Sequence, residues 1–420
     1  MANSFNKEEL VAFDDVFEAF QDGLVVSKLF AKYQLDDISA ERTGNIIWRP
    51  QPYIAQSFTG LDQSSNFARN YTQLAVPATL GYSHSVPLTL SATELRDLLQ
   101  SKRLGMAAMQ RLASDINVDC SNLAALTGTV FIKRSSAAAG FDDIAACDNA
   151  FNRMGVPMDN RVCLLSSGDY NAMASGLAGS NRSFGNDISD PALRKAYVGP
   201  IANFETYKLD YAYRKALAGG SSITLNAANQ YYTPKATSTA TTGEISNVDN
   251  RYQTITVNST TNVVAGDAFT LAGVNEAHHI TKADTGSLKT FRVISVPDST
   301  HLVISPPIIS GGGSTDAELQ YKNCVGTPAS NAALTFLNTV AAAVNPFWQA
   351  DAFEIVPGHY RPEQDAGLAV TSATTDQGVT VTMARQGAIG DLSCKYRWDV
   401  FFGLVNKQPE MTGVMMFSQT

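Results

Sequence analysis

Long apolar runs, phosphate-binding loops and an excess of positive charge are all missing from this chain of 420 residues. No stretch approaches the roughly 18 apolar residues that a membrane helix needs. No Gly-Lys pair, GxGxxG, GxSxG or HExxH pattern occurs. The 31 lysines and arginines face 39 aspartates and glutamates, a net charge of -8 that argues against a generic nucleic-acid or membrane-surface binder. The N-terminus does not resemble a signal peptide, so we expect a protein made and used in the cytoplasm or released by lysis.

Cysteine and histidine are scarce. The cysteines are odd in number and form no CxxC pair, which argues against a disulfide framework or a local zinc site; they are Cys120, Cys147, Cys163, Cys324 and Cys394. Glu276, His278 and His279, with His301 and His359 elsewhere, are a weak metal candidate. Exposed loop histidines are the more ordinary interpretation. Adjacent aspartates point apart on a helix, so they make poor acid-base pairs. We predict no catalytic, cofactor or metal site.

The N-terminal half changes character several times. Apolar residues at helical spacing between Ser4 and Tyr33 predict an amphipathic helix in an arm, residues 1–42. Residues 43–90 are interrupted by prolines and glycines, which predicts an extended β loop. Ser91-Ala92-Thr93-Glu94 is a capping box that predicts a long spine helix running to near Asp119. The spine helix begins a segment, residues 91–220, that forms the first part of a central domain. This segment is also predicted to contain two helices (142–154 and 168–177) and a strand (162–165). The region 176–190 predicts a surface loop.

A change in composition near residue 219 predicts an inserted domain, residues 221–330. Serine, threonine, asparagine, glycine and β-branched residues dominate there, and short alternating runs at 252–257, 268–274, 291–296 and 301–304 predict an all-β barrel or sandwich. An alanine-rich stretch from Ala332 is compatible with a helix that leads to Asn345. Further strands over 353–417 rejoin the first domain, so residues 331–420 complete it. The predicted class is α+β, with a discontinuous central domain.

Matching segments before, within and after the insertion carry a family resemblance. They include residues 45–50, 95–116, 248–252, 254–257, 291–293, 298–301, 347–348, 409–410 and 413–414. In this order they resemble the major coat proteins of short-tailed double-stranded DNA bacteriophages. The resemblance implies the Hong Kong-type tailed-phage capsid fold with an inserted β-barrel domain. It also implies a major capsid protein, not an enzyme, that self-assembles with a scaffolding protein into an icosahedral shell of pentamers and hexamers.

The same resemblance implies the protein's surroundings. We expect a virion protein assembled in the host bacterial cytoplasm, with a portal at one vertex, packaged DNA inside without sequence-specific binding, no membrane and no cofactor. The rival interpretations are another phage structural part, such as a tail or decoration protein, and a carbohydrate-binding β module. In the second rival, Tyr231, Tyr232 and Tyr252 would stack on sugars.

Five residues are candidate contacts between subunits: Trp48, Arg49, Glu244, Asp249 and Arg251. Trp48 is either such an anchor or a residue buried within one chain, and aromatic enrichment at interfaces slightly favours the anchor. Residues 236–250 resemble the family's insertion loop that bridges neighbouring capsomers across two-fold positions. A Ser/Thr-rich surface turn is the equal alternative.

Overall fold

The structure is a computed structural model. It describes residues 13–33, 45–179 and 198–420, apart from residues 15, 19, 22, 53, 68, 92, 93, 95–97, 361–367, 389 and 391. The chain forms two compact units. Unit 1 contains Met1–Ile47, Pro77–Ser121 and Phe353–Val405, and unit 2 contains Trp48–Val76, Asn122–Ala352 and Asn406–Thr420. The domain boundaries predicted above, including 221–330 for the insertion, stay predictions.

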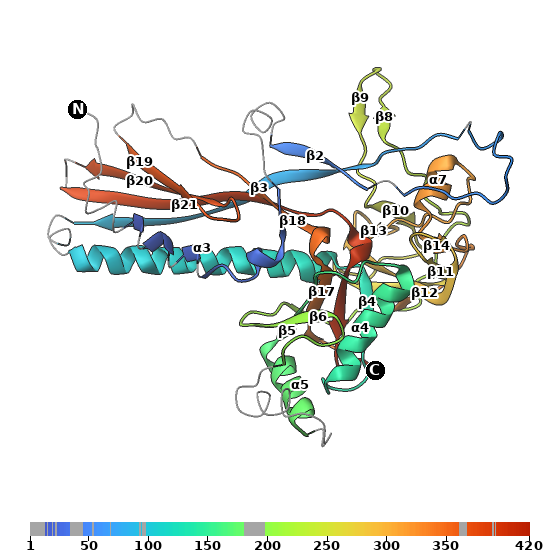
Figure 1. The fold of residues 1–420 in the computed structure, drawn as a ribbon, viewed down its shortest axis with the longest axis horizontal. Helices are drawn as coiled ribbons and strands as arrows, with labels where there is room; N and C mark the ends of the chain where they lie inside the picture. The colour runs from blue at the N-terminus through green and yellow to red at the C-terminus, as the bar shows by residue number, and fades with distance from the viewer. Residues whose placement is uncertain are drawn as a thin grey trace. The chain divides into compact units, whose positions relative to one another are not determined.

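A seven-stranded sheet is the main element of unit 1 (Figure 1). Its strand order is β1-β18-β21-β20-β19, and β3 also pairs with β21 and with β2. The strands are β1 (Ala31–Lys32), β2 (Ile46–Pro50), β3 (Ala75–Leu90), β18 (Phe353–Pro357), β19 (Ala369–Thr374), β20 (Thr380–Ala388) and β21 (Ser393–Asn406). The predicted extended β loop is therefore confirmed at both of its ends, by β2 and β3.

The N-terminal arm is helical over a shorter range than predicted. The described residues between 13 and 23 are helical, and Phe13, Phe20 and Leu24 are buried, so the predicted apolar face is confirmed there. The chain then forms a single 3-10 turn, η1 (Ser27–Leu29), and the short strand β1. The helix predicted up to Tyr33 is wrong beyond residue 23, because the Tyr33 amide donates to Ile355 O at 3.1 Å in a strand ladder. Residues 4–12 lie outside the described residues.

The predicted spine helix is α3 (Leu98–Thr127). The capping box is present in part, because the Ser91 amide donates to Glu94 Oε2 at 2.8 Å. The helix ends eight residues beyond the predicted Asp119. Cys120 and Ala124 continue the buried stripe of Ile116 at four-residue spacing, which a helix requires. Gly128 follows the last turn, where an added Cβ would lie 3.0 Å from the Gly413 backbone.

A five-stranded sheet and two helices form one part of unit 2. The strand order is β4-β22-β17-β5-β6. The elements are β4 (Val130–Lys133), α4 (Phe141–Met154), β5 (Arg161–Ser166), α5 (Ser167–Gly179), β6 (Phe204–Leu209), β17 (Asn345–Gln349), η3 (Ala350–Ala352), η5 (Pro409–Met411) and β22 (Thr412–Met416). The helix and strand predictions for 142–177 are confirmed. The loop predicted from residue 176 is wrong up to residue 179, where α5 still continues, and residues 180–190 lie outside the described residues.

The four strands predicted in the insertion lie in a six-stranded sheet of unit 2, ordered β10-β13-β12-β11-β14 with β15 on β11. The strands are β10 (Gln253–Thr256), β11 (Ala268–Ala277), β12 (Asp284–Ser295), β13 (His301–Ser305), β14 (Cys324–Val325) and β15 (Leu334–Phe336), and the last two were not predicted. The chain at 223–226 closes the sheet, because Leu334 N donates to Ile223 O at 2.9 Å and Asn226 N donates to Thr256 O at 3.0 Å. Fully buried Phe269, Phe291 and Leu302 fill the interior.

The helix considered from Ala332 is wrong. That stretch contains β15 and β16 (Ala342–Ala343), the latter paired with β7 (Arg214–Lys215). Leu334 and Phe336 lie beside the edge of β11, and pairing with it satisfies their backbone groups while Leu334 is buried. Tertiary pairing therefore outweighs the helical propensity of alanine. The short helix α7 (Asp316–Tyr321), within residues 221–330, was not predicted.

Candidate functional site

Trp48 and Arg49 lie on β2, and both are half-buried. Their neighbour Ile47 is 8% exposed, whereas Ile46 is 40% exposed. Trp48 is therefore neither a fully buried core residue nor a fully exposed anchor. The role of both residues as subunit contacts stays a prediction.

Glu244 lies in the turn of a hairpin formed by β8 (Thr237–Thr239) and β9 (Ile245–Asn247) (Figure 1). Every residue from 237 to 247 is exposed, including Ile245 at 68%. The turn is closed by the Ala240 amide, which donates to Glu244 O at 2.8 Å. Gly243 adopts a φ of 85°, which favours glycine. The hairpin therefore extends its strands into solvent within this chain.

Asp249 and Arg251 lie at the base of the hairpin and bind each other. Arg251 Nε donates to Asp249 Oδ1 at 2.9 Å and Arg251 Nη2 donates to Oδ2 at 2.6 Å, a bidentate pair. Arg251 Nη1 also donates to Asn406 O at 2.9 Å. Burial alone would lower the pKa of Arg251, but the bond to Asp249 raises it, so the guanidinium stays charged. Of the five candidates, Glu244 is thus fully exposed, while Asp249 and Arg251 are joined to each other within the chain.

One strand of the six-stranded sheet, β12, carries polar side chains that bind elements outside that sheet. Lys289 and Arg292 are only 4% and 1% exposed. The Thr290 hydroxyl donates to Thr129 O at 2.8 Å and accepts from Phe131 N at 3.2 Å, at the edge strand β4. Arg292 Nη2 donates to Ala125 O at 2.5 Å, in the last turn of α3. The strand β12 therefore binds other parts of its own chain through buried charged groups.

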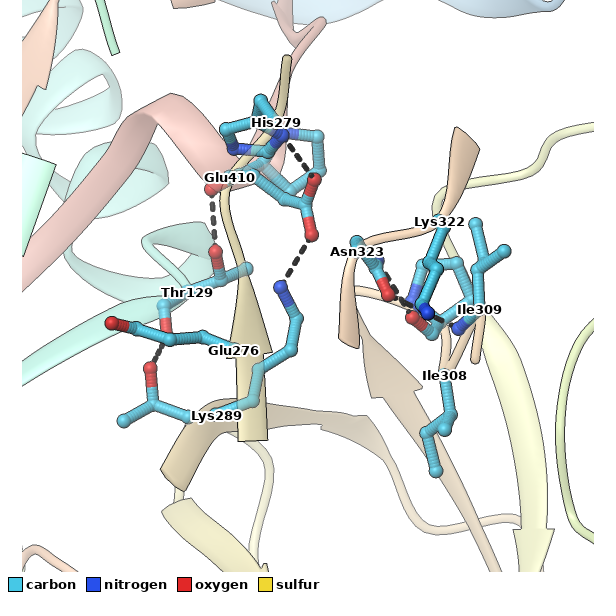
Figure 2. Close-up of polar contacts among 12 residues, drawn as sticks. Thr129, Glu276, His279, Lys289, Ile308, Ile309, Lys322, Asn323 and Glu410 are labelled. Atoms are coloured by element: carbon cyan, nitrogen blue, oxygen red, sulfur yellow. Dashed lines mark hydrogen bonds and ion pairs between the residues drawn. The ribbon is translucent and has the colours of Figure 1, made fainter. Parts of the chain in front are cut away.

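The carboxylate of Glu410, in η5, is the centre of a second polar contact of β12. Figure 2 shows it between His279 and Lys289. Lys289 Nζ lies 2.6 Å from Glu410 Oε1, and His279 Nδ1 lies 3.3 Å from Oε2. The Thr129 hydroxyl donates to Pro409 O at 2.5 Å beside it. The cluster joins β12, and the connection between β11 and β12, to η5, and Thr129, just before β4, binds η5 beside it.

The electrostatics of this cluster follow from burial and from its cations. Burial alone would raise the pKa of Glu410, but Lys289 and His279 hold it below its ordinary value, so the group is a carboxylate at neutral pH. Burial lowers the pKa of His279, so its ring is neutral at pH 7. Burial also lowers the pKa of Lys282 to about 8, and Lys289 and Lys322 add to that effect. Charges buried in this way are stable only with partners.

The residues of the weak metal candidate do not share a site, because Glu276, His278 and His279 each bind a different partner. Glu276 pairs with Arg153, and His278 Nδ1 accepts from Ile280 N at 3.2 Å. His279 faces Glu410. Among the residues that the structure describes, no three histidine, cysteine or carboxylate side chains gather as a metal site, and no helix is long and apolar enough to cross a membrane. The described cysteines are all free and buried.

The tyrosines of the carbohydrate-binding rival are half-buried. The Tyr232 hydroxyl donates to Asn250 Oδ1 at 3.0 Å, and the Arg251 guanidinium lies 5.0 Å from the centre of the Tyr252 ring. Two of the three rings are therefore already occupied by partners in the chain.

Comparison with known proteins assigns the family. The family model of the P22 coat protein, gene protein 5, matches residues 1–418. The chain belongs to the P22 coat protein family. It is therefore a major capsid protein of tailed phages, a structural component of the virion that forms a shell from copies of itself, and it is not an enzyme.

Solved structures of phage capsids resemble the chain at low identity. A Mycobacterium phage Che8 structure matches with a TM-score of 0.45 and 12% identity, covering 93% of this chain and 90% of that chain. The mature capsid of bacteriophage PhiM1 matches with a TM-score of 0.43 and 9% identity, covering 99% and 88%. The I-domain of the CUS-3 coat protein is 37% identical, with a TM-score of 0.23, covering 29% of this chain and 99% of that domain.

Proposed function

We propose that copies of this chain form an icosahedral shell of pentamers and hexamers. A scaffolding protein guides a first procapsid in the host bacterial cytoplasm, a portal occupies one vertex, and the shell expands as double-stranded DNA is packaged. Membership of the P22 coat protein family carries the proposal. One chain that occupies both five-fold and six-fold rings needs adjustable contact surfaces as well as rigid ones.

The hairpin β8–β9 supports the proposal as an adjustable contact. A two-stranded hairpin is marginally stable by itself in water, and each residue of 237–247 is exposed. Contact with a neighbouring subunit would bury Ile245, which is 68% exposed in the single chain. Glu244 at the turn would then face the neighbour. We propose that the hairpin bridges neighbouring capsomers.

The extended loop between β2 and β3 supports a second contact. Leu61 and Phe67 are 104% and 87% exposed, and Phe58 and Tyr71 are 37% and 58% exposed on the same loop. Large apolar side chains gathered on one exposed segment favour a protein interface. We propose that they pack on a second copy, with Trp48 and Arg49 at the base of the loop beside that interface.

The net charge of -8 suits a container for DNA. A strongly basic lining would bind phosphates and oppose the movement of DNA during packaging. We expect assembled shells to bind free DNA only weakly. Tight, salt-dependent binding of free DNA by empty shells would contradict this part of the proposal.

Co-expression with and without the candidate scaffolding protein, followed by electron microscopy, tests the main proposal. The expected result is closed shells of uniform size with the scaffolding protein, and aberrant or few particles without it. Tubes, rings or trimers in both arms would favour the tail or decoration rival. A chain that stays monomeric in both arms would overturn the proposal. Ile245→Ser should reduce shell yield, whereas Leu217→Ser, a change at an exposed apolar residue outside both proposed contacts, should not.

A further inference from the structure

The short helix α7 of the insertion holds the extended loop of the same chain. Gln320 is 1% exposed and makes two hydrogen bonds to one loop residue. Its Oε1 accepts from Thr72 N at 3.0 Å and its Nε2 donates to Thr72 O at 3.2 Å. The neighbouring Tyr321 hydroxyl donates to the same Thr72 O at 2.8 Å. Two side chains of α7 thus satisfy both backbone groups of Thr72, as a neighbouring strand would.

Apolar packing strengthens this contact. Leu74 is 3% exposed and forms a small buried cluster with Tyr321 and Ile309, with Ile54 packed against it. Ile54 and Leu74 lie on opposite branches of the loop, so the cluster closes its base. Burying a leucine side chain contributes about 2 kcal/mol, more than a single exposed hydrogen bond does. The base of the loop is therefore held by the insertion.

The first residue of α7, Asp316, holds the loop further toward its tip. The Asn70 amide donates to Asp316 Oδ2 at 3.2 Å, and Arg69 Nη1 lies 3.5 Å from Oδ1. Gln56, on the other branch, donates to Asp316 O at 3.4 Å. Asp316 and Arg69 are about one third exposed, so this ion pair by itself contributes little. Its importance is positional, because it aligns both branches of the loop.

Beyond these contacts, the loop tip is folded by its own groups. Gln63 Nε2 donates to Gly60 O and Asn66 Nδ2 donates to Gln63 Oε1, both at 2.6 Å. The Arg69 guanidinium lies 4.8 Å from the centre of the Phe58 ring. The tip is thus a pre-formed unit whose base is attached to α7. Its most exposed side chains are Leu61 and Phe67.

We propose that α7 is a clasp that fixes the extended loop before assembly, so that Leu61 and Phe67 are presented to a second copy of this chain. The inference rests on the proposed assembly function. An unattached loop would have to lose its backbone freedom at the moment of contact, and the cost of that ordering would weaken the subunit interface. The clasp makes that ordering part of the folding of the chain instead.

The double variant Gln320→Met and Tyr321→Phe tests the clasp, because it removes the hydrogen bonds to Thr72 and keeps the volume of both side chains. Trypsin reports the release, since Arg69 is the only lysine or arginine between Arg49 and Arg96, and Arg49 is followed by proline. Loss of these bonds should speed cleavage after Arg69 in the unassembled protein by about tenfold. Shell assembly with the scaffolding protein should slow by a similar factor.

Gln253→Met is the matched control. Gln253 is also a buried glutamine with two backbone bonds in the insertion, to Gln230 O at 3.1 Å and from Ile308 N at 2.7 Å. It should lower stability without faster cleavage after Arg69. Asp316→Ala changes a partly exposed residue and should speed cleavage after Arg69 by a smaller factor. This variant tests the clasp if the double variant does not fold.

The outcomes separate the two proposals. Faster cleavage after Arg69 with an unchanged assembly rate would overturn the clasp, and so would unchanged cleavage in both α7 variants. If the wild-type chain itself forms no shells with the scaffolding protein, the proposed function fails instead, while the cleavage result still reports whether α7 holds the loop.

Discussion

The hairpin β8–β9 and the strand β12 belong to the same unit, unit 2, but place their polar groups in opposite environments. All residues of 237–247 are exposed, and Glu244 lies in solvent. On β12, Lys289 and Arg292 are almost completely buried and bind other parts of the chain. A charge in solvent contributes little to folding, whereas a buried charge that loses its partner is costly. The hairpin is therefore available for contacts with other subunits, whereas β12 stabilises the fold of its own chain.

The largest expected loss of stability comes from substituting Glu410. Glu410→Gln leaves Lys289 buried without a counter-charge and should lower the free energy of unfolding at pH 7 by about 3 kcal/mol. The pKa of Glu410 is lowered from 4.5, so its contribution is present above pH 4.5 and is lost as the pH falls through the lowered value. The difference between wild type and variant should therefore shrink in acid. Urea denaturation at several pH values measures it, with Glu244→Gln on the hairpin as a control that should change nothing.

Two glycines of positive φ sharpen the comparison. Gly155, at a φ of 79°, ends α4, and an added Cβ would lie 2.5 Å from the His278 ring. Gly243, at a φ of 85° in the hairpin, has no atom within 4 Å of such a Cβ. Gly155→Ala should cost about 2 kcal/mol, from backbone strain and from displacement of His278, and Gly243→Ala only about 1 kcal/mol. Equal losses in urea denaturation would show that the contact with His278 is unimportant.

Removing the charge of Lys282 should stabilise the protein. Its pKa is lowered from 10.5 to about 8, so below pH 10.5 the unfolded chain binds the proton more tightly, and the charge costs stability at pH 7. Lys282→Gln should raise the free energy of unfolding by about 1.5 kcal/mol at pH 7. The gain should disappear as the pH rises from 8 to above 10.5. A gain that is independent of pH, or one shared by the exposed Lys395→Gln control, would contradict the role of burial.

Asp249 tests whether the base of the hairpin belongs to the fold or to the interface. Asp249→Lys removes the bidentate partner of Arg251, whose side chain is 10% exposed, and should cost about 1 kcal/mol in the unassembled chain. Asp249→Asn keeps one acceptor and should cost less. If both variants keep wild-type stability but lose shell assembly, Asp249 is a subunit contact and its bond to Arg251 is secondary.

The smallest effect on stability is expected at the hairpin itself. Ile245→Ser should change the free energy of unfolding by no more than about 0.5 kcal/mol, because Ile245 is exposed in the single chain. The same change should lower shell yield, measured by sedimentation of assembled particles. A large loss of stability in the unassembled chain would show that the hairpin contributes to the fold and would remove the contrast with β12.

Periodic segments were predictable because their signal is local. The alternating runs of the insertion became β10 to β13, and the capping box with its apolar stripe preceded α3. The errors lie where partners distant in sequence decide. Two short strands, β15 and β16, lie within residues 332–345, and Leu334 to Phe336 pair with β11, although the alanines of this stretch favour a helix. The predicted N-terminal helix fails at its end, where Ala31 and Lys32 instead form β1 and pair with β18.

The polar clusters were missed for a similar reason. Glu410, Lys289 and His279 are separated by up to 131 positions, and nothing near any of them in sequence indicates the others. α7 did have a local signal, because Thr315 caps it by accepting from Glu318 N, and Thr315-Asp316-Ala317-Glu318 has the capping-box pattern. The sequence predicts Asp249 and Arg251 as contacts between subunits, a role that stays a prediction. Their spacing of two residues allowed the pair within the chain that the structure contains.

Local spacing and composition alone determined the α+β class, the long helix and the β insertion of this chain, because helix and strand periods are properties of neighbouring residues. Which charges are buried together, where α3 ends and what holds the extended loop depended on the tertiary structure. Burial and distant pairing set the free energy of those groups, and neither is encoded within a short stretch of residues.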